Sequence, residues 1–217
     1  MAVESNAGRV GVWGRSGSGK STYVKGLIAA RSRVVVFDPL DEYGKLRGFV
    51  TLRSVEALRI EMAKRWRGGF KLAYVPPSMQ EAAALDRLSL LCLRAQVPFR
   101  DGKDRRQLTL VVEEMNLCFP VNGLPGELRG FGEICSRGRH YGIEVVGVSQ
   151  RIAEVATRFR GNCTATVVFA QQGPRDLRAA ADALGFADPV EVRGLGDHEY
   201  LRAENGTIER GKNRLRA

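Results

Sequence analysis

Apolar runs and helical patterns alternate along the chain, an arrangement typical of α/β proteins with a parallel sheet. The apolar runs, often β-branched, predict strands at residues 10–13, 33–37, 49–53, 70–75, 108–112, 143–148 and 164–170. Helical spacing and helix signals predict helices at residues 21–30, 54–66, 78–97, 128–141 and 174–184. Residues 199–203 and 207–209 flank an Asn-Gly pair and predict a β-hairpin. We therefore expect an α/β fold in which helices flank a mainly parallel central sheet, with a small C-terminal hairpin.

Residues 14–21 match the phosphate-binding pattern G-x-x-x-x-G-K-[ST] at every fixed position, between a predicted strand and a predicted helix. Glycines let backbone N–H groups turn toward phosphate oxygens, and the helix N-terminus adds the positive end of its dipole. Lys20 is expected to reach the β- and γ-phosphates of ATP, and the Ser21 hydroxyl to bind Mg²⁺. The residues assigned to the nucleotide are Gly14, Arg15, Ser16, Gly17, Ser18, Gly19, Lys20, Ser21 and Thr22.

Two carboxylates, Glu113 and Glu114, follow the strand predicted at residues 108–112. An apolar strand that ends in two acidic residues is typical of the second half of a P-loop ATPase site. We expect Glu113 to hold the hydration shell of Mg²⁺ opposite Ser21, and Glu114 to orient and deprotonate the water that attacks the γ-phosphate. Aspartate is more usual at the first of these two positions, so Glu113 departs from the common pattern.

Polar residues near the strand at 143–148 are further candidates for catalysis. Gln150 comes just after this strand, where an amide can contact the γ-phosphate or the attacking water, so it is a candidate sensor. Arg137 and Arg139 precede the strand and lie too far along the fold to serve their own nucleotide easily. At a subunit boundary such an arginine would neutralise transition-state charge in the neighbouring site. From spacing alone, the solvated end of a basic helix is the better explanation of both arginines.

Composition narrows the class of protein. The chain has 217 residues, 44% of them hydrophobic, which is enough for one substantial core. No apolar run reaches about 18 residues, so no membrane span is expected, and residues 1–6 lack the pattern of a secretory signal. Cys92, Cys118, Cys135 and Cys163 form no C-x-x-C pair, which favours reduced core thiols in a cytosolic protein over a zinc site. The net charge of +10 favours a polyanionic partner, although charge alone also reports solubility.

Four blocks occur in an order that resembles the FtsK–HerA superfamily of ring-forming, DNA-translocating ATPases. They are the P-loop, Asp38-Pro39-Leu40-Asp41-Glu42-Tyr43, Glu113-Glu114, and the segment from Ser136-Arg137-Gly138-Arg139 to Ser149-Gln150-Arg151. The resemblance spans about residues 9–170. An ATPase core of this size is similar to the genome-packaging ATPases of tailless, membrane-containing phages and related archaeal viruses. The resemblance implies a RecA-like P-loop fold in which the chain, residues 1–217, is one ATPase domain. Its core would occupy about residues 9–185, and the hairpin and a basic tail about residues 186–217.

The resemblance also implies roles by position. Lys20 and Ser21 match the Walker A ligands, and Glu113 and Glu114 match the Walker B acid and the catalytic base. Gln150 matches the sensor at the end of the following strand.

Three arginines and one aspartate have less settled roles in this family pattern. Arg139 lies three residues before the Gly-Ile entry to the strand at 143–148, where an arginine finger acting in trans is expected. Arg137 and Arg151 compete for that role. Asp38 matches the acid after the second strand, whose function the resemblance leaves open.

The function implied is that of a Mg²⁺-dependent ATPase that forms a homo-oligomeric ring, by analogy a hexamer, and pumps double-stranded DNA into a virion. Such a protein works in the host cytoplasm or at the packaging vertex, beside a capsid or membrane protein of the virion. The DNA contacts expected are Arg100, Lys103, Arg105, Arg106, Arg158 and Arg160. Three alternatives stay open: a cellular HerA-like translocase or helicase core, a phage assembly ATPase that does not act on DNA, and a nucleotide-binding scaffold without turnover.

Overall fold

The computed structural model describes residues 7–185 and 189–213. Residues 1–6, residues 186–188 and the end of the expected basic tail from residue 214 lie outside the described residues. The strands are β1 Arg9–Trp13, β2 Arg33–Phe37, β3 Val50–Leu52, β4 Phe70–Tyr74, β5 Leu108–Val112, β6 Ile143–Ser149, β7 Ala165–Phe169, β8 Glu199–Glu204 and β9 Thr207–Lys212. The α-helices are α1 Lys20–Ile28, α2 Val55–Arg65, α3 Glu81–Ala95, α4 Val97–Arg100, α5 Met115–Cys118, α6 Gly130–Arg137, α7 Thr157–Arg160, α8 Pro174–Leu184 and α9 Val190–Arg193. Three 3-10 helices are η1 Tyr43–Lys45, η2 Gly138–Tyr141 and η3 Ile152–Glu154.

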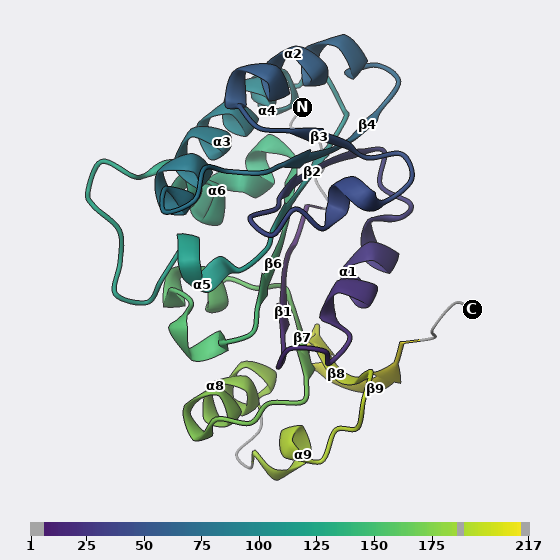
Figure 1. Cartoon of the computed structure of the whole chain (residues 1–217), viewed down its shortest axis with the longest axis vertical. Helices are drawn as coiled ribbons and strands as arrows, with labels where there is room; N and C mark the ends of the chain where they lie inside the picture. Colours follow the sequence, from purple (N-terminus) through teal and green to yellow (C-terminus); the bar gives the residue numbers. More distant parts are fainter. Residues whose placement is uncertain (1–6, 186–188, 214–217) are drawn as a thin grey trace. The chain divides into compact units, whose positions relative to one another are not determined.

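The strands form a mixed, mostly parallel nine-stranded sheet in the order β3-β4-β2-β5-β6-β1-β7-β8-β9 (Figure 1). β2 pairs in parallel with β4 and β5, β3 pairs in parallel with β4, and β1 pairs in parallel with β7. β8 runs antiparallel to both β7 and β9. The expected α/β architecture, including the C-terminal hairpin, is therefore confirmed.

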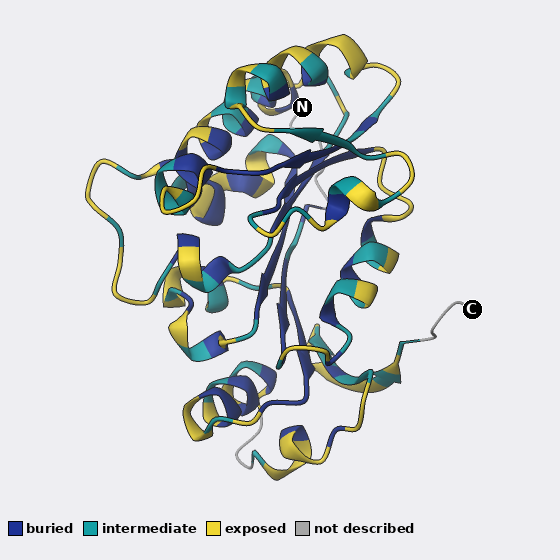
Figure 2. Ribbon diagram, viewed as in Figure 1, coloured by how far each residue is buried: buried dark blue, intermediate teal, exposed yellow. Residues whose placement is uncertain are grey.

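The chain divides into two compact units. The first contains Arg31–Glu113 and Leu124–Val145, and thus β2 to β5 with helices α2, α3 and α6. Every residue of β2 and β5 is buried, as their dark blue ribbons show in Figure 2. Burial of both faces explains why these strands, apart from Arg33 and Thr109, are apolar in sequence rather than alternating. Ser54 caps α2 as its position predicts, since its hydroxyl accepts a hydrogen bond from the Ala57 N–H at 3.1 Å.

The second unit contains Arg9–Ala30, Glu114–Gly123 and the chain from Val146 onward. It holds the pairs β1–β7, β7–β8 and β8–β9, together with α1 and α8. Rings from three elements meet in its core, where Tyr23 of α1 packs edge-on against Phe169 of β7 and Tyr200 of β8, with centroids 6.1 and 5.0 Å away. This packing fixes the C-terminal hairpin against the first helix of the same unit.

Some boundaries differ from the sequence expectations. The helix expected over residues 78–97 is α3, which ends at Ala95, and a separate short helix, α4, begins at Val97. Pro98 has no N–H to donate to the Arg94 carbonyl oxygen and its ring crowds that carbonyl, so α3 does not continue through it. The segment 128–141 is α6 followed by the 3-10 helix η2. β9 extends to Lys212, so the first residues of the expected basic tail belong to a strand. Among the described residues, no helix is long and apolar enough to cross a membrane.

All four cysteines are free thiols, as their spacing predicts. Cys92, Cys118 and Cys135 are buried, and Cys163 is partly buried. Burial raises the pKa of the Cys92 thiol to about 12, so this side chain stays protonated at neutral pH.

Candidate active site

The phosphate-binding loop joins the end of β1 to the first turn of α1. Two backbone hydrogen bonds hold the first residues of the loop. The Gly14 N–H donates to the Ser149 carbonyl oxygen at 3.3 Å, and the Arg15 N–H donates to the Ala170 carbonyl oxygen at 2.9 Å. Ser149 ends β6 and Ala170 follows β7. A Cβ added at Gly14 would lie 2.6 Å from the Cβ of Phe169, so glycine is required for this close approach. The loop is thereby anchored at the carboxyl ends of β6 and β7, the two strands that flank β1 in the sheet.

Lys20 points back over the loop that precedes it. Its ammonium group donates to the Gly14 carbonyl oxygen at 2.7 Å and to the Arg15 carbonyl oxygen at 3.0 Å, and the residue is only 8% exposed. The Ser18 hydroxyl is buried and has no hydrogen-bond partner in the part of the chain that the structure describes. A buried polar group without a partner costs about 1–3 kcal/mol, which a phosphate oxygen in the loop would offset. The residues present therefore fit a bound phosphate.

The other loop residues assigned from the sequence lie at or near the surface. Ser16, Gly17 and Thr22 are exposed, while Gly19 and Ser21 are partly buried. Gly17 and Gly19 have φ angles of +72° and +105°, a region that other residues rarely adopt. Glycine at these two places is thus a requirement of the loop conformation.

Glu114 and Gln150, the predicted base and sensor, are brought together. The Gln150 amide Nε2 donates to Glu114 Oε1 at 3.0 Å. Glu114 immediately precedes α5 and has a left-handed backbone (φ +46°), a conformation that is uncommon outside glycine and that clusters at functional sites. The residues next to this pair in sequence are also linked: the Ser149 hydroxyl donates to Asn116 Oδ1 at 2.8 Å, which joins the end of β6 to α5. The two side chains that the sequence assigned to hydrolysis therefore form one hydrogen-bonded pair.

Glu113 belongs to the first unit, where the segment after β2 holds it. Its backbone N–H donates to the Phe37 carbonyl oxygen at 3.1 Å, and its Oε1 accepts a hydrogen bond of 2.5 Å from the Tyr43 hydroxyl. Asp38 in turn accepts backbone hydrogen bonds from Glu42 (3.1 Å) and Tyr43 (2.8 Å). Sequence reasoning did not assign Tyr43, although it closes the Asp-Pro-Leu-Asp-Glu-Tyr block.

Burial sets the protonation of this group of side chains. It raises the pKa of Tyr43 far above its usual value, with the Glu113 carboxylate as the next cause, so the phenol is a hydrogen-bond donor at any physiological pH. Burial also raises the pKa of Asp38, and the backbone hydrogen bonds from Tyr43 and Glu42 oppose that shift. The direction of the Tyr43–Glu113 hydrogen bond is therefore defined.

Residues from the C-terminal hairpin region contact the phosphate-binding loop. The Asn213 amide Nδ2 donates to the Gly19 carbonyl oxygen at 2.7 Å, and Asp197 forms an ion pair with Arg15 at 3.0 Å. His198 has a left-handed backbone (φ +63°), and its Nδ1 atom is buried without a partner among the described residues. Nothing in the sequence signals these contacts, which join positions more than 180 residues apart.

A groove of about 330 Å³ lies along α1 beside the end of β9. Its size falls in the usual range for small-molecule sites. Its lining includes polar side chains, an aromatic ring, a glycine and a leucine. The lining residues are Thr22, Tyr23, Gly26, Leu27, Lys212 and Asn213.

The oxygen atoms predicted to bind Mg²⁺ are a hydroxyl and a carboxylate. Ser21 lies in the first turn of α1 and Glu113 directly after β5. Both are hard oxygen ligands of the kind that Mg²⁺ prefers, usually together with water and phosphate oxygens. Within the described ranges, no cluster of three or more His, Cys, Asp or Glu side chains forms a metal site of any other kind.

Residues 7–116 match the family model described as Helicase HerA, central domain. This match covers just over half of the chain. The chain belongs to this family. It is an FtsK–HerA P-loop ATPase by its family match and its fold. No curated protein sequence matches the chain.

Solved structures of other proteins share the fold. The genome packaging NTPase B204 from Sulfolobus turreted icosahedral virus 2, in complex with AMPPCP, has a TM-score of 0.74 and 16% identity, with 97% of this chain and 99% of that chain covered. VirB4 of Thermoanaerobacter pseudethanolicus has a TM-score of 0.66 and 14% identity, with coverages of 100% and 93%. The plasmid coupling protein TrwB, in complex with ADP and Mg²⁺, has a TM-score of 0.65 and 14% identity, with coverages of 96% and 85%. At these identities the likeness establishes the fold alone.

The candidate finger arginines of this HerA-family chain differ in their partners. Arg137 forms an ion pair with Glu133 one helical turn earlier. Arg151 forms an ion pair of 2.7 Å with the buried Asp176. Arg139, in η2, is exposed and forms no ion pair with any described residue. Arg139 is therefore the one of the three whose guanidinium is not already engaged.

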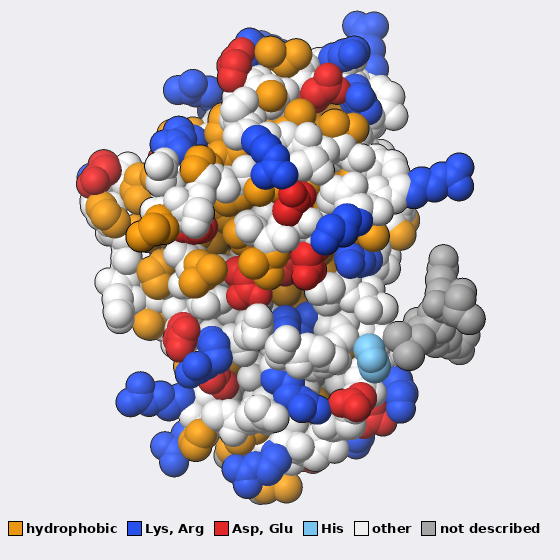
Figure 3. Space-filling view, in the orientation of Figure 1, with side chains coloured by type: hydrophobic (Ala, Val, Ile, Leu, Met, Phe, Trp, Pro, Cys, Tyr) orange, Lys and Arg blue, Asp and Glu red, His pale blue; other side chains and the backbone are white. Residues whose placement is uncertain are grey.

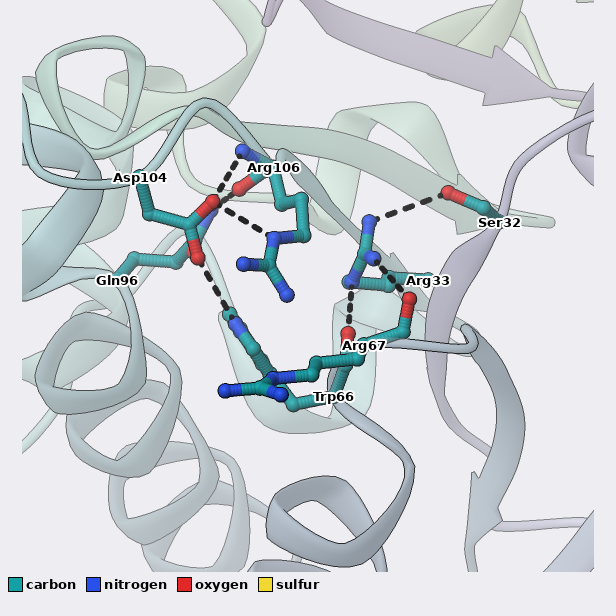
Figure 4. Close-up of polar contacts among 7 residues, drawn as sticks. All are labelled: Ser32, Arg33, Trp66, Arg67, Gln96, Asp104 and Arg106. Atoms are coloured by element: carbon teal, nitrogen blue, oxygen red, sulfur yellow. Dashed lines mark hydrogen bonds and ion pairs between the residues drawn. The ribbon is translucent and has the colours of Figure 1, made fainter.

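Arg106, one of the basic residues before β5, is held by hydrogen bonds within the first unit. Figure 4 shows Arg106 bound to Asp104, which also accepts a hydrogen bond of 3.1 Å from the Trp66 indole. The Arg33 guanidinium lies over the Trp66 ring at 5.8 Å and donates to the Trp66 carbonyl oxygen. Burial, together with the nearby charge of Arg106, lowers the pKa of Arg33. This cluster joins β2, the end of α2 and the loop before β5, so Arg106 has a structural role as well.

Of the remaining candidates for DNA contact, some belong to the first unit and some to the second. Arg100 donates to Asp101 and to the Tyr141 hydroxyl, whereas Lys103 and Arg105 are exposed. In the second unit, Arg158 is exposed, and Arg160 is partly buried and donates to the Val155 carbonyl oxygen at 2.9 Å. On the face drawn in Figure 3, Lys and Arg side chains lie among Asp and Glu side chains and do not merge into one basic patch.

Proposed function

We propose that the chain hydrolyses ATP, with the P-loop and the Glu114–Gln150 pair as its hydrolytic site. The observation that carries this proposal is the 3.0 Å hydrogen bond between these two side chains in the unit that also holds the P-loop. Lys20 neutralises charge on the β- and γ-phosphates, Glu114 accepts a proton from the attacking water, and Gln150 orients that water. Together with the loop backbone, these groups act mainly by positioning and electrostatic stabilisation.

Ser21 and Glu113 are the residues that would hold Mg²⁺. When bound, Mg²⁺ neutralises charge on the phosphate oxygens as a Lewis acid. Backbone N–H groups of the loop beyond Arg15, up to Thr22, bind the phosphates of the nucleotide. The groove beside α1 takes the adenosine part, because it continues from Thr22 and is large enough for a nucleoside.

The mechanical function that we propose is translocation of double-stranded DNA, in the form of viral genome packaging. The fold likeness to the packaging NTPase B204 over 97% of this chain supports it, as does the net charge of +10. The exposed Lys103, Arg105 and Arg158 are the first candidates for phosphate contacts, with Arg100, Arg106 and Arg160 in supporting positions. A packaging motor acts in the host cytoplasm or at the vertex of the virion, beside a capsid or membrane protein.

We further propose that the two units act as one ATPase domain and that copies of the chain form a ring, by family analogy a hexamer. Arg139 then serves as the finger that stabilises transition-state charge in a neighbouring subunit, since it is exposed and forms no ion pair with a described residue. Arg137 is the second choice. The family match to the HerA central domain favours one alternative function, a cellular HerA-like DNA translocase.

The substitution Glu114→Gln tests the hydrolytic site, because it keeps the shape of the side chain and removes the base. We expect the rate of ATP hydrolysis to fall by about 10²- to 10⁴-fold while ATP affinity stays within about twofold of wild type. Glu127→Gln, which alters an exposed carboxylate to which no role is assigned, serves as the control and should keep the wild-type rate.

Hydrolysis at the wild-type rate by Glu114→Gln would overturn the assignment. The same assay, run with double-stranded DNA at increasing salt, tests the translocase proposal. DNA should raise the wild-type rate, and the effect should fall steeply with salt because phosphate contacts release counterions. A rate that DNA does not change would favour an assembly ATPase or a scaffold.

A further inference from the structure

The segment from Asp38 to Tyr43 is a rigid connection between β2 and η1. One oxygen of the Asp38 carboxylate accepts the backbone N–H of Glu42, and the other accepts that of Tyr43. Asp41 has a left-handed backbone (φ +53°), and its side chain forms an ion pair with Arg53 at 2.6 Å. The 1% exposed Asp38 therefore sets the backbone position of Tyr43 from inside the protein.

The ring of Tyr43 is fixed as firmly as its backbone. It is fully buried and packs against Phe49 at a centroid distance of 5.7 Å and an interplanar angle of 61°. Because the ring cannot move without opening this packing, its hydroxyl is a fixed point, and it donates to Glu113 Oε1 at 2.5 Å. The Glu113 backbone is bound to Phe37 at the end of β2. Both ends of the glutamate are thus held by β2 and the residues that follow it.

We propose that Tyr43 is a positioning residue: its hydroxyl holds the Glu113 carboxylate in the orientation that binds the Mg²⁺ of the bound nucleotide, and Asp38 holds Tyr43 in place. The inference rests on the proposed ATPase function. A glutamate side chain has three rotatable torsions, so an unrestrained carboxylate samples many orientations and loses entropy when it binds a metal ion. A hydrogen bond to one oxygen removes that freedom in advance. Partners of this kind typically change metal affinity or activity by about 10- to 100-fold when they are lost.

The Asp-Pro-Leu-Asp-Glu-Tyr block then serves to hold the Glu113 carboxylate. Serine or threonine at position 43 would be too short to bridge the distance that the tyrosine ring spans. Phenylalanine would fill the same space without a donor. The chemistry therefore requires tyrosine at one end of the block and a buried acceptor of backbone N–H groups at the other.

The test is Tyr43→Phe, with Tyr74→Phe as the matched control. Tyr74 is also a buried tyrosine of the first unit, but its hydroxyl interacts with Arg87 rather than with Glu113. Binding of Mn²⁺ is measured by electron paramagnetic resonance in the presence of ADP, and ADP binding is measured with and without Mg²⁺. We expect Mn²⁺ affinity to fall about tenfold or more in Tyr43→Phe, and ADP affinity without metal to stay unchanged. Tyr74→Phe should match wild type in both measurements.

A double-mutant cycle separates positioning from general damage. In a Glu113→Gln background, Tyr43→Phe should cause no further loss of Mn²⁺ affinity, because the carboxylate that it positions is gone. A further loss of the same size in that background, or wild-type Mn²⁺ affinity in Tyr43→Phe, would overturn the inference. If Tyr43→Phe does not fold, Asp38→Asn is measured in its place. It should weaken Mn²⁺ binding in the wild-type background and not in Glu113→Gln, and any other result overturns the inference.

The proposed function fails in a different way. If the wild-type protein itself shows no metal-dependent binding of ADP, the ATPase proposal falls, and the role of Tyr43 falls with it. If wild type binds Mn²⁺ and ADP together while Tyr43→Phe equals wild type, only the role of Tyr43 is lost.

Discussion

Replacing Gly19 by alanine tests the geometry of the phosphate-binding loop. The φ angle of +105° at Gly19 is one that residues with a Cβ rarely adopt, at a cost of about 1–3 kcal/mol. The new Cβ would also lie 2.7 Å from His198 Nδ1 and 2.9 Å from Asn213 Nδ2. Such overpacking costs about 1–3 kcal/mol more. Alanine recovers about 0.4–1 kcal/mol by restricting the unfolded chain, so the net loss of unfolding free energy should be about 3 kcal/mol.

Gly17 in the same loop is the matched control. Its φ angle is +72°, close to the left-handed helical region, and a Cβ there would meet no atom within 4 Å. Only the backbone term of about 1–2 kcal/mol then applies, and the gain in the unfolded state offsets part of it. We expect Gly17→Ala to cost about 1 kcal/mol.

The assay is urea-induced unfolding followed by circular dichroism, with the free energy of unfolding extrapolated to water. The two alanine variants should differ by about 2 kcal/mol. Adding His198→Ala to Gly19→Ala should recover about 1 kcal/mol relative to the sum of the single changes, because it removes one of the two close contacts. Equal losses in Gly17→Ala and Gly19→Ala, within about 0.5 kcal/mol, would refute the reasoning that the hairpin region packs on Gly19.

Two further changes test the groove and the core. Gly26→Leu should lower ATP affinity by about tenfold or more and leave tripolyphosphate binding unchanged. The reason is that a Cβ at Gly26 meets no atom within 4 Å, so the leucine fills only the groove. Titration calorimetry with both ligands measures the two affinities, and equal losses of affinity for ATP and tripolyphosphate would contradict the adenosine assignment. Burial raises the pKa of Cys92 to about 12, so above about pH 9 the unfolded thiol loses its proton first and the unfolding free energy falls as pH rises, by at most about 1.4 kcal/mol per pH unit. Urea unfolding between pH 8 and pH 10.5 should therefore show a shallower fall for Cys92→Ala than for wild type, and parallel slopes would count against this reasoning.

Much of the fold follows from local patterns. The uninterrupted apolar run that follows Arg33, at residues 34–37, predicts a strand buried on both faces, and every residue of β2 is buried. The Asn205-Gly206 pair predicts the hairpin turn, and both residues have the positive φ angles that this turn needs. The helix expected to end at Val97 ends at Ala95, and the separate helix α4 that follows was not predicted, although Pro98 is a local signal for this break.

The Glu114–Gln150 pair was predictable because polar residues that follow parallel strands collect at one edge of a sheet. Glu114 was assigned from the pair of carboxylates after an apolar strand and Gln150 from its place just after another strand, and the two are hydrogen-bonded. The contacts of the loop with Asp197, His198 and Asn213 had no such signal. They depend on where β8 and β9 pack against α1, which local patterns do not encode.

By itself, the sequence determined the strands, the helices and the loop that binds phosphate, because these depend on side-chain periodicity, glycine backbone freedom and short-range spacing. Only the tertiary structure decided which side chains hold the Glu113 carboxylate and the phosphate-binding loop in place. Tyr43 reaches Glu113 across 70 positions, and Asn213 reaches Gly19 across 194. Contacts at such separations arise from the packing of whole elements, and hydrogen bonds a few ångströms long are made or lost with small changes in that packing.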